Sequence, residues 1–134
     1  MKDRCKELKL DDNITFTGHI PHENIVEYFQ KLSVFIAVST RESFGVSILE
    51  AAACGVPAVT SNVGGLPEVN KDKVTGFLIQ PNNASLLAEK ILKNYENDKL
   101  WHLMSNNARK RVVKLFDWDL SVDQMKELYK KYQC

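Results

Sequence analysis

Two short apolar stretches constrain the fold more than any other feature of this 134-residue chain. Residues 34–38 read VFIAV without a polar break, and residues 56–62 read VPAVTSN. Strands that are apolar on both sides are typical of a parallel sheet covered by helices on both faces. Because strand-like and helix-like segments alternate around them, these stretches predict an α/β fold with a Rossmann-like parallel sheet.

The flanking segments continue this alternation. Residues Ile14–Gly18 alternate in polarity and are rich in β-branched and aromatic types, which predicts a further strand, and residues 75–81 (TGFLIQP) predict another. The spacing of apolar residues predicts one helix before Val34 and another that ends at Gly55, a residue type common just after a helix. Pro67 is suited to the first turn of a short helix.

The last third of the chain is predicted to be helical. Asn83, Asp98 and Asp117 are suitable N-caps for three successive helices. Helical spacing predicts that the last helix turns an apolar side inward, made of Met125, Leu128, Tyr129 and Tyr132.

The predicted sheet indicates where a ligand would bind. Ligands of open parallel sheets bind beyond the carboxyl ends of the strands. The loops at those ends are residues 18–22, 39–43, 61–67 and 80–83.

Composition narrows the classes of function. A hydrophobic fraction of 44% supports one folded domain, and 18 Lys and Arg against 17 Asp and Glu argue against nucleic-acid binding driven by net charge. No apolar run approaches the ~20 residues of a membrane span, and the first twelve residues lack the apolar core of a signal peptide. The three cysteines have no metal-ligand spacing, so we expect no metal and a reducing, cytoplasmic setting.

Two acids flank the start of the helix that follows residues 34–38. Glu42 precedes this helix and Glu50 lies within it; a fully helical interval would separate them by roughly 12 Å. The helix N-terminus between them favours phosphate, and Gly45 allows a close approach. A ligand with a sugar, a diphosphate and a ribose has this order of groups. The alternative, an exposed loop acid and a helix acid paired with lysine, stays open on the residues alone.

Other candidate features have simpler interpretations. His19 follows a predicted strand and could line a nucleobase pocket or act as an acid or base, but a surface histidine is the more common case. Gly64 and Gly65 match no phosphate-loop motif and are interpreted as a tight turn. The basic run 109–114 is interpreted as the solvated face of a helix.

Four motifs in order resemble one known family. They are T-G-x-x-P at 17–21, E-S-F-G-x-x-x-x-E at 42–50, G-V-P-A-V-T-S at 55–61 with G-G-x-P-E at 64–68, and T-G-F-L-I-x-P at 75–81. Together they resemble the donor-binding half of family 4, or "group 1", retaining glycosyltransferases with the GT-B fold. The likeness runs from about residue 13 to residue 118.

The resemblance implies roles for individual residues. The first acid of the motif contacts the transferred sugar, which makes Glu42 the catalytic candidate, and the second acid, Glu50, holds the ribose. Backbone amides after the first acid contact the sugar and the diphosphate, here Ser43, Phe44, Gly45 and Val46. The loop after the T-G strand, here His19 and Ile20, lies on the side of the base. The donor is a UDP- or GDP-linked sugar used as substrate, with no metal or other cofactor.

The resemblance also implies a partial domain. Residues 1–134 would form one nucleotide-sugar-binding domain without the family's first β-α-β unit, which carries an Arg and a Lys for the diphosphate, and without the N-terminal acceptor domain. The full-length enzyme would act in polysaccharide assembly on a glycan or lipid acceptor, with peripheral membrane association compatible with that role. We expect residues 1–134 alone to be inactive. The alternatives are a non-catalytic module that binds a nucleotide or a partner and, less favoured, a UDP-sugar epimerase.

Overall fold

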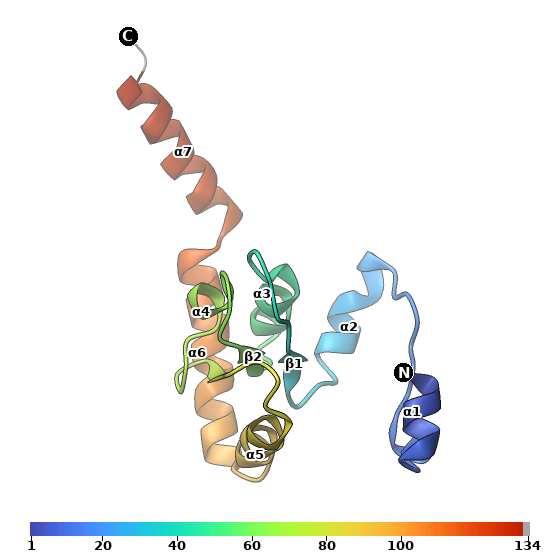
Figure 1. The fold of residues 1–134 in the computed structure, drawn as a ribbon. Coiled ribbons are helices and arrows are strands. Elements are labelled where there is room, and N and C mark those ends of the chain that lie inside the picture. Colours follow the sequence, from blue (N-terminus) through green and yellow to red (C-terminus); the bar gives the residue numbers. More distant parts are fainter. Residues whose placement is uncertain (133–134) are drawn as a thin grey trace.

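The computed structural model describes residues 1–132 and has a three-stranded parallel sheet at its centre. The strands β1 (Phe35–Ala37), β2 (Ala58–Ser61) and β3 (Gly76–Ile79) lie in the order β1-β2-β3 (Figure 1). Phe35 is in register with Ala58, and Ala58 with Gly76. The parallel sheet predicted from the apolar stretches is therefore confirmed.

Helices connect and follow these strands. Their bounds are α1 (Lys2–Glu7), α2 (Ile25–Phe29), α3 (Val46–Ala53), α4 (Leu66–Val69), α5 (Ala84–Tyr95), α6 (Asp98–Leu115) and α7 (Trp118–Tyr132). Two short 3₁₀ turns, η1 (Asp11–Asn13) and η2 (His22–Asn24), precede α2. The helices predicted before residue 34, up to Gly55 and after Pro67 are present at α2, α3 and α4.

The central strand β2 is buried along its whole length, and its side chains alternate between two covered faces. Ala58 packs with Ile48 of α3 and Leu66 of α4 on one face. Val59 packs on the other face, where Met104 of α6 and apolar residues of α5 cover it. Helices thus cover both faces of the sheet, as the uninterrupted apolar stretches predict.

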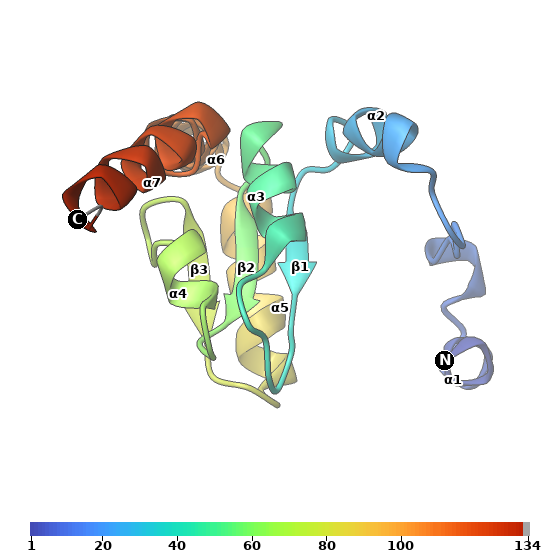
Figure 2. The same cartoon turned by 90° about the horizontal axis from the view of Figure 1, so that it is seen from above.

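The segment Ile14–Gly18, predicted to be a strand, is not one. It has no strand partner, and every residue in it is exposed. Together with α1 it stands apart from the sheet (Figures 1 and 2). A pattern of β-branched and aromatic residues becomes a strand only when a neighbouring strand accepts its backbone hydrogen bonds, and the described residues place none there.

Two predictions for the C-terminal helices need correction. The N-cap of α6 is Asn97, not Asp98, because the Asn97 carboxamide oxygen accepts a hydrogen bond from the Leu100 amide at 3.0 Å. Asp117 does cap α7, but the predicted inward side of that helix is exposed, since Tyr129 is 62% accessible. Figure 1 shows α7 extending away from the sheet.

Candidate functional site

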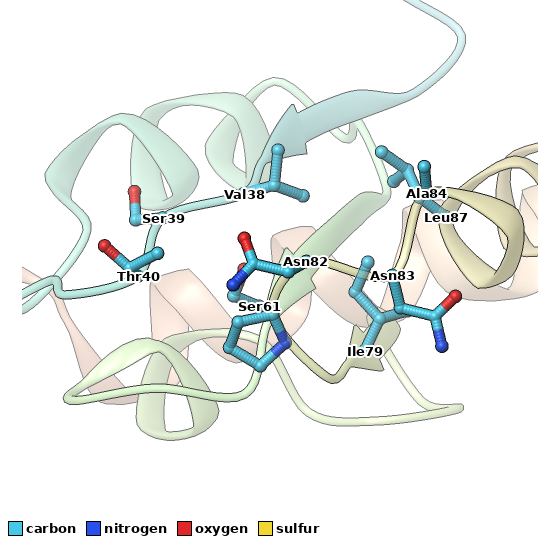
Figure 3. Close-up of a pocket in the computed structure, with 10 residues that line it drawn as sticks. Val38, Ser39, Thr40, Ser61, Ile79, Asn82, Asn83, Ala84 and Leu87 are labelled. Atoms are coloured by element: carbon cyan, nitrogen blue, oxygen red, sulfur yellow. The ribbon is translucent and has the colours of Figure 1, made fainter.

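The carboxyl ends of all three strands open into one hollow of about 310 Å³. Its walls come from the loops after β1 and β3, from the last residues of β2 and β3, and from the first turns of α5 (Figure 3). The Ser61 hydroxyl lines it, is buried, and has no hydrogen-bond partner among the described residues. Three of the four loops predicted to border a ligand therefore meet, although none of the predicted site residues lines this hollow.

Glu42 lies in the loop between β1 and α3, just beyond the hollow along the chain. Glu42 is a half-buried residue, and its Oε1 accepts a hydrogen bond from the Ser43 amide at 3.0 Å. The N–H of Ser43 and the carbonyl of Glu42 belong to the same peptide group. The orientation of the carboxylate is therefore coupled to one rigid peptide plane.

The N-terminus of α3 follows directly. Gly45 caps it with φ at +92°, in the left-handed region that favours glycine. Its carbonyl accepts from the amides of Ile48 and Leu49. Among residues 1–132, no acceptor faces the amides of Phe44, Gly45, Val46 and Ser47. Unpaired N–H groups at a helix N-terminus are suited to bind an anion.

Glu50 lies one turn further along α3, four residues after Val46. Only residues 46–50 of the interval between the two acids are helical, so the 12 Å derived from a continuous helix does not describe their separation; the helical part rises about 6 Å. The Glu50 side chain is 34% exposed, and its Oε1 lies 4.0 Å from Nδ1 of His22.

His22 is thus the histidine that the structure places beside Glu50. Its side chain is 88% exposed. His19 is exposed and Ile20 half-buried, and no hydrogen bond or ion pair joins the side chain of either residue to Glu42 or Glu50 in the part of the chain that the structure describes. The only signal for His22 in the sequence is its place at the start of a helical turn, which says nothing about its distance from Glu50.

An aromatic pair packs under the start of α3 and fixes the loop that carries Glu42 to the end of α6. Phe44 and Phe116 meet edge to face with ring centroids 5.9 Å apart, and Phe116 packs against the core cluster of Ile48 and Leu66. The Arg111 guanidinium lies 6.0 Å from the centre of the Phe116 ring. The end of α6 therefore supports the loop that carries the candidate site.

The basic run of α6 is more than the solvated face expected from the sequence. Arg109 donates to the carbonyl of Ala53, the last residue of α3. Nη2 of Arg111 donates to the carbonyl of Glu68 in α4 at 2.6 Å. Two cations of α6 thus complement the C-terminal ends of both helices that start at the candidate site.

The Cys54 thiol lies at the end of α3. Burial raises its pKa, an increase that the positive charge of Arg109 opposes and the negative charge of Glu50 reinforces. Cys54 is therefore held as a neutral thiol rather than a reactive thiolate.

Two further features bear on function. Across residues 1–132, no cluster of three or more His, Cys, Asp or Glu side chains is placed to hold a metal ion. Within the same residues, no helix combines the length and the apolar character that crossing a membrane requires.

Comparison with known proteins gives a consistent result. The sequence model described as "Glycosyl transferases group 1" matches residues 1–111. N-acetyl-alpha-D-glucosaminyl L-malate synthase of Bacillus anthracis is 32% identical over 124 residues, which are 92% of this chain and 32% of that protein. The chain spans about a third of the length of the curated relatives it matches.

Solved structures share the fold over nearly the whole chain. Sucrose-phosphate synthase from Thermosynechococcus elongatus superposes with a TM-score of 0.91 at 35% identity, over 97% of this chain and 33% of that one. HepE of Anabaena in complex with UDP superposes with a TM-score of 0.92 at 27% identity, over 97% of this chain and 35% of that one. HepE has also been solved with UDP-glucose.

Proposed function

Because the chain belongs to the glycosyl transferases group 1 family, we propose that it is the donor-binding part of a glycosyltransferase that moves a sugar from a nucleotide-linked donor to an acceptor. The observation that carries this proposal is the order of groups at the start of α3. A half-buried carboxylate, four unpaired backbone amides and a second carboxylate follow one another from Glu42 to Glu50.

Each group has a chemical task in this proposal. The Glu42 carboxylate accepts hydrogen bonds from hydroxyls of the transferred sugar and orients it. The amides of Phe44, Gly45 and Val46 bind the diphosphate, and Glu50 binds the ribose hydroxyls. The HepE complexes with UDP and UDP-glucose support a nucleotide sugar as the class of ligand.

The chemistry follows from the charges. As the bond between sugar and phosphate breaks, positive charge develops on the sugar and negative charge on the leaving diphosphate. Preorganised N–H groups stabilise that developing anion, and a carboxylate that fixes the sugar lowers the barrier by positioning alone. We assign retention of the anomeric configuration without assigning a covalent intermediate.

The setting of the reaction belongs to the same proposal. The full-length protein would act in the cytoplasm in polysaccharide assembly, on a glycan or lipid acceptor held by another domain, with peripheral association with a membrane. His19 and Ile20 would lie on the side of the base, and no metal would take part.

Donor binding and turnover test the proposal. The full-length protein is titrated with UDP-glucose and GDP-mannose, and each is compared with its free nucleoside diphosphate. We expect Glu50→Gln to weaken binding of the free nucleotide and of the sugar nucleotide alike, by at least about tenfold, since a hydrogen bond to a charged group contributes roughly 1.5–3 kcal/mol. Glu42→Gln should weaken binding of the sugar nucleotide but not of the free nucleoside diphosphate, and it should lower turnover.

Glu68→Gln is the matched control, because Glu68 is an exposed acid in the first turn of the neighbouring helix α4. Unchanged affinity and turnover in both the Glu42 and Glu50 variants would overturn the site assignment. Donor binding without any turnover by the full-length wild type would favour the non-catalytic module instead.

A further inference from the structure

We propose that the glycine pair Gly64 and Gly65 positions Glu42 for the sugar, so that the turn after β2 acts as a positioning element of the donor site. The inference rests on the proposed function, because it assigns these glycines a role through Glu42. The sequence predicts that the pair forms a tight turn in a loop at the same edge of the sheet as Glu42, but it does not indicate that the two loops touch.

The two turns touch backbone to backbone. A Cβ atom at Gly64 would overlap the carbonyl oxygen of Glu42 and lie 3.0 Å from its carbonyl carbon. A Cβ atom at Gly65 would overlap the carbonyl oxygen of Ser43 and lie 3.1 Å from Cα of Phe44. These contacts are with main-chain atoms, which cannot rotate away as the end of a side chain can. Only glycine allows this approach.

The contact reaches the carboxylate through a single peptide group. Gly64 faces the carbonyl oxygen of the peptide that joins Glu42 to Ser43, and the Gly65 amide lies 3.4 Å from that same oxygen. The N–H of that peptide donates to the Glu42 carboxylate. Because a peptide group is planar and rigid, displacement of its oxygen reorients the N–H and the carboxylate bonded to it.

The turn itself is fixed by the core. Leu66, which follows the glycines, is fully buried among Ile48, Ala58 and Val69. Gly45, at the far end of the Glu42 loop, is buried next to the Leu66 side chain. The position of the glycine pair is therefore fixed by the core, and a bulkier residue there would displace the Glu42 loop rather than α4.

Alanine at each glycine tests the proposal, with Gly55→Ala as the matched control. Gly64 has φ of +51° and Gly55 has φ of +77°, so alanine at either site is strained. Near Gly55, however, a Cβ would approach only the Ser105 hydroxyl, at 3.2 Å, and that side chain is not part of the donor site. All three variants are compared in the full-length protein by thermal melting, by affinity for UDP and UDP-glucose and by turnover of UDP-glucose.

We expect Gly64→Ala to lower turnover by about 100-fold, the loss that an error of about 1 Å in position can cause. Gly65→Ala, whose overlap is shallower, should lower turnover less, and Gly55→Ala should change melting but not turnover. Gly64→Ala should also reduce the preference for UDP-glucose over UDP, because it displaces the Glu42 carboxylate, which in the proposed function contacts the sugar and not the nucleotide.

A double variant separates positioning from general damage. If Gly64 acts through Glu42, then Gly64→Ala should have little further effect in a Glu42→Ala background. An equal loss in both backgrounds, or turnover of Gly64→Ala no lower than that of Gly55→Ala, would overturn the positioning role while leaving the proposed function intact. Normal turnover of Glu42→Ala would overturn the proposed function, and the positioning role with it.

Discussion

Replacement of Asn70 is expected to cost the chain about 3 kcal/mol of unfolding free energy, because one buried carboxamide joins α4 to two strands. Asn70 ends α4 and is 2% exposed. Its Nδ2 donates to the carbonyl of Ala58 at 3.2 Å, to Oγ1 of Thr60 at 3.0 Å and to the carbonyl of Phe77 at 3.1 Å. The side chain therefore ties β2, β3 and the helix that follows the glycine pair.

The magnitude follows from the number of N–H donors. The Asn70 carboxamide has two N–H groups, which are shared among the three acceptors, and the loss of each buried donor costs about 1.5 kcal/mol. We do not add the Thr75 hydroxyl, which donates to Oδ1 of Asn70 but also lies 3.3 Å from the Lys71 carbonyl. The total of about 3 kcal/mol should lower the melting temperature by roughly 10 °C in a chain of this length.

Urea denaturation followed by circular dichroism measures this loss. Asn106→Ala, at an exposed position of α6, is the control and should leave stability within about 0.5 kcal/mol. Asn70→Asp keeps the size of the side chain and an acceptor for Thr75 but removes the donor, so at pH 7 it should be at least as damaging as alanine. Wild-type stability of the Asn70→Asp variant would refute the reasoning, because it would show that the hydrogen bonds donated by the two N–H groups contribute nothing.

Two further predictions concern the helices around the candidate site. Phe116→Ala should lower stability by about 2 kcal/mol, because it removes an aromatic ring that packs on the core and pairs with Phe44, and it should also weaken binding of UDP-glucose. The control Phe16→Ala, in the exposed N-terminal segment, should change neither stability nor binding. An equal loss in both variants would contradict the anchoring role of Phe116. Burial raises the pKa of the Cys54 thiol. The stabilisation that comes from this pKa shift is complete below the pKa of the unfolded thiol, about 8.5, and it is lost as the pH rises through the higher pKa of the folded state. Urea midpoints measured from pH 7 to 10.5 should therefore fall more steeply for the wild type than for Cys54→Ala, and parallel curves would exclude Cys54 as a source of alkaline instability.

The sheet could be predicted from the sequence because strands that are buried on both faces have uninterrupted runs of apolar residues. The stretches at 34–38 and 56–62 contain β1 and β2, and the helices that cover them appear at the expected places. Resemblance to a family then made the two acids candidates for donor binding, which spacing alone could not distinguish from unrelated surface carboxylates.

The failures have a common physical cause. Ile14–Gly18 and α7 have the residue pattern of elements that pack on a partner, and in this structure both are exposed. A pattern of apolar residues records which side of an element can be buried, but not what buries it. The error of one residue at the start of α6 is smaller in kind, since Asn97 and Asp98 are both good N-caps.

The two ends of the candidate site differ in how firmly the fold holds them. Glu42 lies in a loop confined between the core of α3 and the glycine turn, with Gly45 and Leu66 buried beside it. The Glu50 carboxylate lies 4.0 Å from the 88% exposed imidazole of His22, which is carried by a segment with few buried residues, and such segments have the lowest local stability in a protein. In the proposed reaction the sugar must be oriented accurately, whereas the ribose needs only to be held. The rigid end of the site is thus the end where accuracy of position controls the rate.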